Sequence, residues 1–249
     1  MPTDELNLLR RGQVEVLGRM PWGSNATLLA QVCGGGDSES AEREGGGGEG
    51  GSIQAVYKPR RGERPLWDFP AGLDKREVAA YQLSEALGWG IVPETVLRDD
   101  LPYGVGSLQR FVPFQTEEHY FSLYEDDAHH PQLRTICCFD LLANQTDRKS
   151  GHCLLALEGG RIWAVDNALS FHVEPKLRTV IWEFGGEAIP DHLRADAARL
   201  VDQGLPDDLC ALLDPDERDA LLRRARHVAD DRSRFPIDGS GRAYPWPLV

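Results

Sequence analysis

Strand-like patterning is concentrated in the first half of this chain, and helix-like patterning dominates the second half. Five segments of the first half have the length and the apolar pattern of strands, at 13–19, 26–32, 53–57, 92–98 and 106–112. One helical segment, 75–87, lies among them. Apolar residues recur at helical spacing over 132–144, 191–203, 207–213 and 216–230, with a hairpin at 153–157 and 161–165. Strands followed by helices predict an α+β fold.

The change of pattern near residues 113–115 indicates two lobes. We expect 1–113 to form a mostly antiparallel sheet with one helix, and 114–249 to form a helical lobe that carries the hairpin. A chain of 249 residues is long enough for two lobes around one cleft. Residues 34–52 are Gly, Glu and Ser with almost no apolar side chains, so we expect a flexible insert there.

Acidic residues outnumber basic ones by 40 to 27, and the net charge is −13. A negative surface repels nucleic-acid phosphates, so no nucleic-acid partner is expected. Arginine supplies most of the fixed positive charge. Where arginine is the rule, a lysine at the end of an apolar strand marks a position that needs a compact ammonium group. The four lysines are Lys58, Lys75, Lys149 and Lys176.

No apolar run is long enough to cross a membrane, and residues 1–11 lack the apolar core of a signal peptide. We therefore expect a cytoplasmic protein without an integral membrane segment. The cysteines form no C-x-x-C pair, which favours buried thiols in a reducing compartment over a zinc site. They are Cys33, Cys137, Cys138, Cys153 and Cys210.

Lys58 ends the third predicted strand, and Glu77 lies on the helix that follows. A strand lysine paired with a helix glutamate is a known device for holding nucleotide phosphates, since the lysine supplies a point charge and the glutamate directs it. Taken alone, a solvent-exposed strand-end lysine and a surface glutamate are the simpler interpretation.

Asp147 lies in the polar stretch 146–152 between an apolar helix and the hairpin. A catalytic loop needs an aspartate to orient a hydroxyl and a metal ligand a few residues later, and His152 has that spacing. Asp166 follows an apolar strand, where its carboxylate suits magnesium. Ordinary polar turns explain each residue separately. The five residues in this order, each on the expected element, favour one nucleotide and metal site.

Three short segments resemble the phosphatidylinositol 3-/4-kinase superfamily, and especially its type II phosphatidylinositol 4-kinases. Residues 139–148 (FDLLANQTDR) resemble the helix and catalytic loop of these kinases, and 164–171 (AVDNALSF) are similar to their metal-binding segment. Residues 108–112 (LQRFV) look like the adenine hinge. The chain as a whole is similar to a family of short actinobacterial proteins assigned to this superfamily. The resemblance covers about 12–171 and implies a two-lobed, protein-kinase-like fold.

The resemblance implies an ATP site. Lys58 would contact phosphates with Glu77 orienting it, the segment 109–112 would meet the adenine through backbone groups, and the turn at 23–25 would cover the phosphates. The residues expected to bind the nucleotide are Ser24, Asn25, Lys58, Glu77, Gln109, Phe111 and Val112.

The resemblance also implies a catalytic aspartate, Asp147, and two metal-holding residues, His152 and Asp166. The expected cofactors are ATP and Mg²⁺ or Mn²⁺. These kinases usually have Asn where this chain has His152. Because magnesium prefers oxygen, an imidazole ligand would shift the preference toward manganese.

The segment after Asp166 lacks the long basic loop with which lipid kinases grip phosphoinositide headgroups. Together with the charge of −13, this favours a protein or a soluble small molecule over a lipid as substrate. We therefore expect an ATP-dependent phosphotransferase acting on a hydroxyl group. The alternatives are a weakly active or inactive nucleotide-binding pseudokinase that acts as a protein-interaction module, and a relative that transfers AMP.

Overall fold

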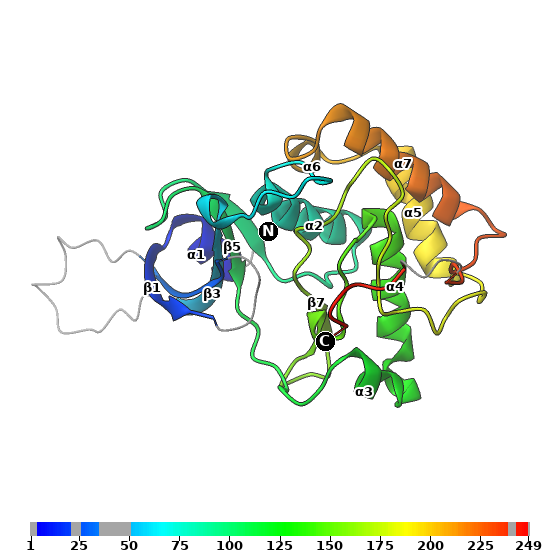
Figure 1. Ribbon diagram of the computed structural model, residues 1–249, viewed down its shortest axis with the longest axis horizontal. Coiled ribbons are helices and arrows are strands. Elements are labelled where there is room, and N and C mark those ends of the chain that lie inside the picture. The colour runs from blue at the N-terminus through cyan, green and yellow to red at the C-terminus, as the bar shows by residue number, and fades with distance from the viewer. Residues whose placement is uncertain (1–3, 21–25, 35–50, 239–242, 249) are drawn as a thin grey trace, which may run out of the picture. The chain divides into compact units, whose positions relative to one another are not determined.

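The structure is a computed structural model that describes residues 4–20, 26–34, 51–238 and 243–248 (Figure 1). Two compact units divide the chain. One consists of Met1–Asp74 with Glu94–Phe111, and the other of Lys75–Pro93 with Val112–Val249. Residues 75–93 pack with the second unit, although the sequence pattern assigned them to the first lobe, and the lobes stay a prediction. Of the expected insert 34–52, residues 35–50 lie outside the described residues.

The first unit is built on an antiparallel sheet of five strands in the order β1-β2-β3-β5-β4. All five strands were predicted from the sequence, and their ends differ by a few residues. Their bounds are β1 Gln13–Arg19, β2 Leu28–Cys33, β3 Ser52–Pro59, β4 Thr95–Arg98 and β5 Gly106–Arg110.

A short helix that the sequence analysis did not predict, α1 (Asp4–Arg11), packs against this sheet. Leu6 and Leu9 are its buried residues. The guanidinium of Arg98 donates from Nη1 to the carbonyl oxygens of Leu9 at 3.1 Å and Gly12 at 2.7 Å. A side chain of β4 therefore satisfies carbonyl groups that the end of α1 leaves without helical partners.

Gly106 begins β5 where that strand passes close to β3. A Cβ atom at this position would lie 2.7 Å from the ring of Tyr57 and 2.8 Å from the Cα of Pro59, and against the carbonyl oxygen of Lys58. We expect Gly106→Ala to destabilise the protein by ~1–3 kcal/mol, because backbone atoms must move to admit the methyl group. Thermal unfolding measures the loss, and Gly18→Ala in β1 is the control, since nothing lies within 4 Å of its added Cβ. Equal shifts for the two variants would contradict the expectation.

The second unit is rich in helices, and α5 runs beside α7 (Figure 1). The buried residues of α4 are apolar except for Asp140, which is fully buried. The helices are α2 Leu73–Leu87, α3 Tyr120–Tyr124, α4 His130–Ala143, α5 Asp191–Gln203, α6 Asp207–Cys210 and α7 Pro215–Ala229. Short 3-10 helices lie at Arg60–Gly62, Asp127–His129 and Ser150–His152.

Polar contacts attach α2 to the helices of the second unit. The guanidinium of Arg76 pairs with the carboxylate of Glu217 at the start of α7, and both side chains are buried. Arg199 of α5 donates to the carbonyl oxygens of Ala86 at 3.0 Å and Leu87 at 2.8 Å. These bonds explain why most of α2 packs with the second unit.

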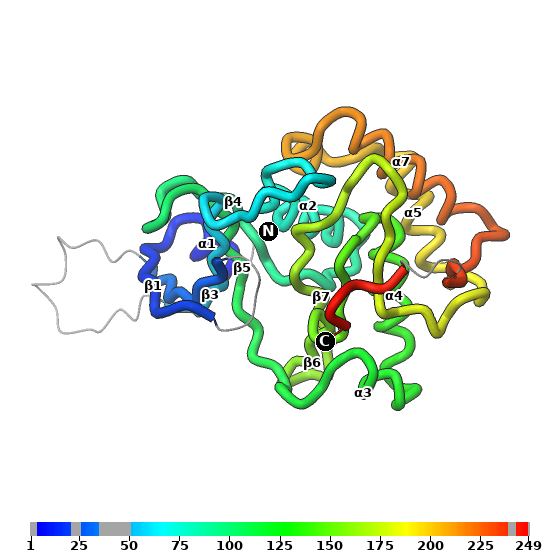
Figure 2. The backbone as a smooth tube through the Cα atoms, in the orientation of Figure 1, coloured from blue at the N-terminus to red at the C-terminus, as the bar shows by residue number. Residues whose placement is uncertain are grey.

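The predicted hairpin is present as β6 (Cys153–Leu155) and β7 (Ile162–Ala164), which pair antiparallel. The tail segment 243–248 folds back near it (Figure 2). The Ser150 N–H donates to the carbonyl oxygen of Leu248 at 2.9 Å, and the Thr179 N–H donates to that of Ala243 at 3.0 Å. The tail is therefore bonded to the turn that precedes β6 and to the segment around Thr179.

None of the helices in the described ranges combines the length and the apolar character that crossing a membrane requires. The five cysteines are free thiols, and three of them are buried, namely Cys137, Cys138 and Cys153. Burial raises the pKa of the Cys153 thiol to about 12.

Candidate active site

Asn144 ends α4 in the left-handed conformation, with φ of 53°. Its side-chain amide donates to the carbonyl oxygens of His172 at 2.9 Å and Glu174 at 2.7 Å, and its Oδ1 accepts from the Lys176 N–H at 2.9 Å. Asn is one of the few residues that adopt this conformation readily. The turn that starts the loop after α4 therefore also fastens the segment 172–176.

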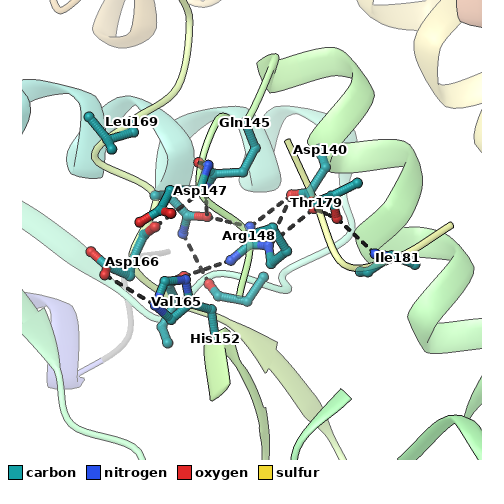
Figure 3. A network of polar contacts seen from close by, with 12 residues as sticks. Asp140, Gln145, Asp147, Arg148, His152, Val165, Asp166, Leu169, Thr179 and Ile181 are labelled. Carbon is teal, nitrogen blue, oxygen red and sulfur yellow. Dashed lines mark hydrogen bonds and ion pairs between the residues drawn. The ribbon is translucent and has the colours of Figure 1, made fainter. Parts of the chain in front are cut away.

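Arg148 is the buried centre of the loop, and its guanidinium is satisfied on several sides (Figure 3). Nε and Nη2 donate to the Asp140 carboxylate at 3.1 and 2.9 Å, and the hydroxyl of Thr179 donates to the same carboxylate at 3.2 Å. Nη2 also donates to Oδ1 of Asn167 at 2.6 Å, and Nη1 to the carbonyl oxygen of Val165 at 2.6 Å. Arg148 thus ties the loop to α4 and to the segment after β7.

Gln145 joins the backbones of the two predicted active-site segments. Its Oε1 accepts from the N–H groups of Thr146 at 2.9 Å and Asp147 at 3.1 Å. Its Nε2 donates to the carbonyl oxygen of Asp166 at 3.3 Å. One fully buried side chain therefore sets the backbone of Asp147 relative to that of Asp166.

Asp147 is largely enclosed, with 25% of its side chain exposed. Burial raises the pKa of this carboxyl above its ordinary value, the negative charge of Asp166 adds to the effect, and the Lys149 ammonium, 3.1 Å from Oδ2, opposes it. Figure 3 shows Asp147 and Asp166 on one side of the Arg148 guanidinium and Asp140 on the other. A carboxylate with a raised pKa is suited to accepting a proton from a hydroxyl group.

Asp166 follows β7 with a positive φ of 56°, a conformation that is uncommon for residues other than glycine and is concentrated at functional sites. Its side chain is 46% exposed, and Oδ2 lies 3.3 Å from Nε2 of His152. The other ring nitrogen of His152, Nδ1, accepts from the Lys149 N–H at 3.3 Å. The backbone of this histidine is bound as well, because the Val165 N–H donates to its carbonyl oxygen at 3.0 Å.

Glu77 is buried on α2, and one carboxylate oxygen accepts from the Asn167 N–H at 3.1 Å. The neighbouring Arg76 donates to the carbonyl oxygen of Ser170 at 2.7 Å. Two successive residues of α2 therefore hold the segment that starts at Asp166. Within the second unit, the structure thus brings together the predicted site residues Glu77, Asp147, His152 and Asp166.

The other predicted nucleotide contacts stay predictions. Lys58 lies on β3, where it pairs with Ser107 of β5. Gln109 is buried on β5 and donates from Nε2 to Oγ1 of Thr95 at 2.8 Å. Lys58 and Gln109 belong to the first unit.

The other four predicted contact residues are Phe111, Val112, Ser24 and Asn25. The Phe111 N–H donates to the carbonyl oxygen of Gln54 at 2.9 Å, so that this group serves the sheet of the first unit. Val112 is buried in the second unit, in one apolar cluster with Trp163. Ser24 and Asn25 lie outside the described residues.

The roles of Arg148 and Lys149 in this arrangement were not predicted from the sequence. Lys149 contacts the Asp147 carboxylate, and its rarity as one of four lysines was a usable signal. For Arg148, the signal was the carboxylate of Asp140 within the apolar run 136–142, since a buried charge requires a partner.

The carboxylates of Asp147 and Asp166 supply oxygen atoms, the donors that a divalent metal such as magnesium prefers. Their like charges lie close enough that Asp166 contributes to the raised pKa of Asp147, and a cation would relieve this repulsion. In the described part of the chain, no group of three or more His, Cys, Asp or Glu side chains is arranged to hold a metal. Magnesium does not need such a group, because it often binds through one or two carboxylates, water and substrate phosphates.

Comparisons with known proteins identify a relative in sequence and solved structures with a similar fold. The chain is 35% identical to "Protein Rv2133c" of Mycobacterium tuberculosis over 98% of its own length and 95% of that protein. No family model matches the chain.

Two solved structures are similar in fold over most of the chain. Hydra Fam20 with sugar matches 92% of this chain and 89% of its own, with a TM-score of 0.55 and 13% identity. The Golgi casein kinase with Mn/ADP bound matches 98% of this chain and 80% of its own, with a TM-score of 0.53 and 12% identity. The kinase-like α+β fold that the sequence predicted is therefore confirmed.

Proposed function

The chain belongs to the family of Mycobacterium tuberculosis protein Rv2133c, and from its kinase-like fold we propose that it is a phosphotransferase that binds ATP and a divalent metal. The observation that carries this proposal is the placement of two carboxylate residues, Asp147 and Asp166, whose backbones the buried side chains of Gln145 and Arg148 hold in one arrangement. A structural neighbour, the Golgi casein kinase, has been solved with Mn/ADP bound, which supports the same ligand class here.

In this proposal, Asp147 orients the substrate hydroxyl and accepts its proton, while Asp166 holds the metal that neutralises the phosphates. Lys149 keeps a positive charge 3.1 Å from the Asp147 carboxylate, where the transferred phosphoryl group needs charge neutralisation. Lys58 and the segment 109–112 would bind the phosphates and the adenine. Glu77 would hold Lys58 in place, and its carboxylate accepts from the N–H of Asn167, the residue after Asp166.

For the substrate, we propose a hydroxyl group on a protein or a soluble small molecule. The net charge of −13 disfavours an anionic lipid surface. The closer assignment to the phosphatidylinositol 3-/4-kinase superfamily rests on the resemblance of three segments, 108–112, 139–148 and 164–171. This assignment is part of the proposal. It describes the ancestry of the chain and does not identify its substrate.

Nucleotide binding is the first test. We expect ATP with Mg²⁺ or Mn²⁺ to stabilise the wild-type protein against heat by ~2.7 kcal/mol at a ligand concentration 100 times the Kd. Asp166→Ala removes the carboxylate that is proposed to hold the metal. We therefore expect this variant to lose most of the metal-dependent stabilisation. Asp191→Ala, a change at a side chain that is 95% exposed, keeps the full effect. Absence of stabilisation with every nucleotide and metal would refute the proposal.

Transfer assays with ATP labelled at different phosphates distinguish phosphoryl transfer, AMP transfer and a pseudokinase. Transfer from ATP labelled in the γ-phosphate supports phosphoryl transfer, and transfer from ATP labelled in the α-phosphate supports AMP transfer. Binding without either transfer supports a pseudokinase that acts through protein contacts. The engagement of His152 with both Lys149 and Asp166 is the observation that keeps this last alternative open.

A further inference from the structure

We propose that His152 is a positioning residue, whose protonated Nε2 lies beside the Asp166 carboxylate, and that it is not a ligand of the metal. This inference rests on the proposed function, because it assigns a role within the same site. It also replaces the sequence-based expectation that His152 and Asp166 hold the metal together.

One ring nitrogen of His152 faces the backbone. Nδ1 of His152 accepts a hydrogen bond from the Lys149 N–H at 3.3 Å, so its lone pair points at that donor. A neutral imidazole carries one N–H and one lone pair. The proton is therefore on Nε2, which lies 3.3 Å from Oδ2 of Asp166. A nitrogen that carries a proton offers no lone pair to a metal.

The backbone around His152 fixes the ring in this orientation. Residues Ser150–His152 form one 3-10 turn, in which the His152 N–H donates to the carbonyl oxygen of Lys149 at 3.1 Å. The Val165 N–H donates to the carbonyl oxygen of His152 at 3.0 Å, so the histidine is bonded to the residue that precedes Asp166. Moving the proton to Nδ1 would set it against the Lys149 N–H, donor facing donor. The tautomer that metal ligation requires is thus opposed by the fold itself.

A donor on the carboxylate of Asp166 has a clear physical use. The side chain of Asp166 is half-exposed, so its rotation needs an external constraint. Groups that hydrogen-bond to a metal ligand orient that ligand, and their loss typically lowers metal affinity or activity by ~10–100-fold. A site whose protein ligands are carboxylate oxygens alone keeps the ordinary preference for magnesium. The shift toward manganese that a nitrogen ligand would cause is therefore not expected.

Two substitutions of His152 separate the two roles. His152→Gln places an amide N–H near the position of Nε2 and can still donate to Asp166. His152→Asn can accept from the Lys149 N–H in place of Nδ1, but it is too short to reach Asp166. Asn is also the residue that related kinases usually have here. If His152 is a metal ligand, the Asn variant should keep the higher metal affinity. If His152 is a positioning residue, the Gln variant should keep it.

The measurement is the affinity for Mn·ADP and Mg·ADP, by electron paramagnetic resonance of free Mn²⁺ and by calorimetry, without turnover. We expect His152→Gln to bind within a few-fold of wild type and His152→Asn to bind ~10–100-fold more weakly. His192→Gln, at an exposed histidine of α5, is the control and leaves affinity unchanged. Wild-type affinity in His152→Asn, whatever the Gln variant does, would overturn the inference, and so would an equal loss in both variants.

Nitrogen-15 NMR of the histidine rings tests the tautomer directly, first without ligand and then with Mg·ADP. We expect His152 to keep its proton on Nε2 in both states. A proton on Nδ1 in either state would overturn the inference. If the protein binds no nucleotide, the proposed function fails, whereas the ligand-free spectrum still decides the tautomer of His152.

Discussion

Asp147→Asn is expected to lower the rate of group transfer by ~10²–10⁴-fold, the contribution typical of a positioned acid or base. The amide has the same shape as the carboxylate but cannot take a proton from the substrate hydroxyl. Burial raises the pKa of Asp147, which means that the fold disfavours its charged form. The neutral variant should therefore unfold at the same temperature as wild type or higher. Single-turnover transfer and calorimetric unfolding measure the two effects.

Both the transfer rate and the effect of Asp147→Asn on stability should depend on pH. Because the folded pKa of Asp147 is raised, transfer should fall as the pH drops through a value above the ordinary 3.8. The ionised carboxylate costs stability above the folded pKa, and this cost disappears as the pH falls through that value. The advantage in unfolding temperature of Asp147→Asn should therefore shrink toward acid pH. A variant that transfers at the wild-type rate, or an advantage that grows in acid, would contradict the role assigned to Asp147.

Asp140→Asn is expected to destabilise the protein by ~3–5 kcal/mol, the usual cost of removing one partner from a buried ion pair. The side chains of Arg148 and Asp140 are 0% and 1% exposed, so the guanidinium would be left charged and without its carboxylate in the interior. At ~2–4 °C per kcal/mol for a domain of 150–250 residues, the unfolding temperature should fall by roughly 10 °C. Differential scanning calorimetry measures this change.

An exposed ion pair provides the matched control for Asp140→Asn. Asp191 is 95% exposed and lies 2.6 Å from Arg194, and Asp191→Asn makes the same chemical change. Exposed pairs contribute ~0–1 kcal/mol, so this control should change stability little. Replacing both members of the buried pair, as in Asp140→Leu with Arg148→Met, should recover part of the loss. A cost for Asp140→Asn no larger than the control's would show that the pair is unimportant for stability.

The strands of the first unit could be predicted because alternation of apolar and polar residues is a local signal. The start of α2 could not be predicted as well. The Glu63 carboxylate accepts from the N–H groups of Gly72 at 3.2 Å and Asp74 at 3.0 Å, and so serves the first turn of this helix from outside it. Capping rules look for the acceptor next to the helix. A partner eleven residues before Asp74 is invisible to them.

The helix α1 was missed for a related reason. A segment of eight residues with few apolar positions is too short to be stable alone. Its support comes from the sheet, including bonds from Arg98, which is 89 residues away from Leu9. Sequence patterning contains no record of such distant contacts.

For the candidate site, residue type and position on an element were enough to select Asp147 and Asp166. The carboxylates follow a helix and a strand, where polar residues with a role are expected to project. Spacing alone could not decide what His152 does, because the answer depends on which ring nitrogen faces the Lys149 N–H. Nor could it reveal that Asp140 and Arg148, eight residues apart, close on each other inside the second unit.

The bond between the Ser150 N–H and the Leu248 carbonyl oxygen has a consequence for how the protein is made. Ser150 lies three residues after Asp147, so the loop that carries the proposed catalytic aspartate is held by residues that the ribosome adds almost a hundred positions later. A nascent chain whose residues 243–248 have not yet left the ribosome lacks this support. Activity should therefore appear only after synthesis has passed them, and an affinity tag for purification is better attached near Asp4 than beside Leu248.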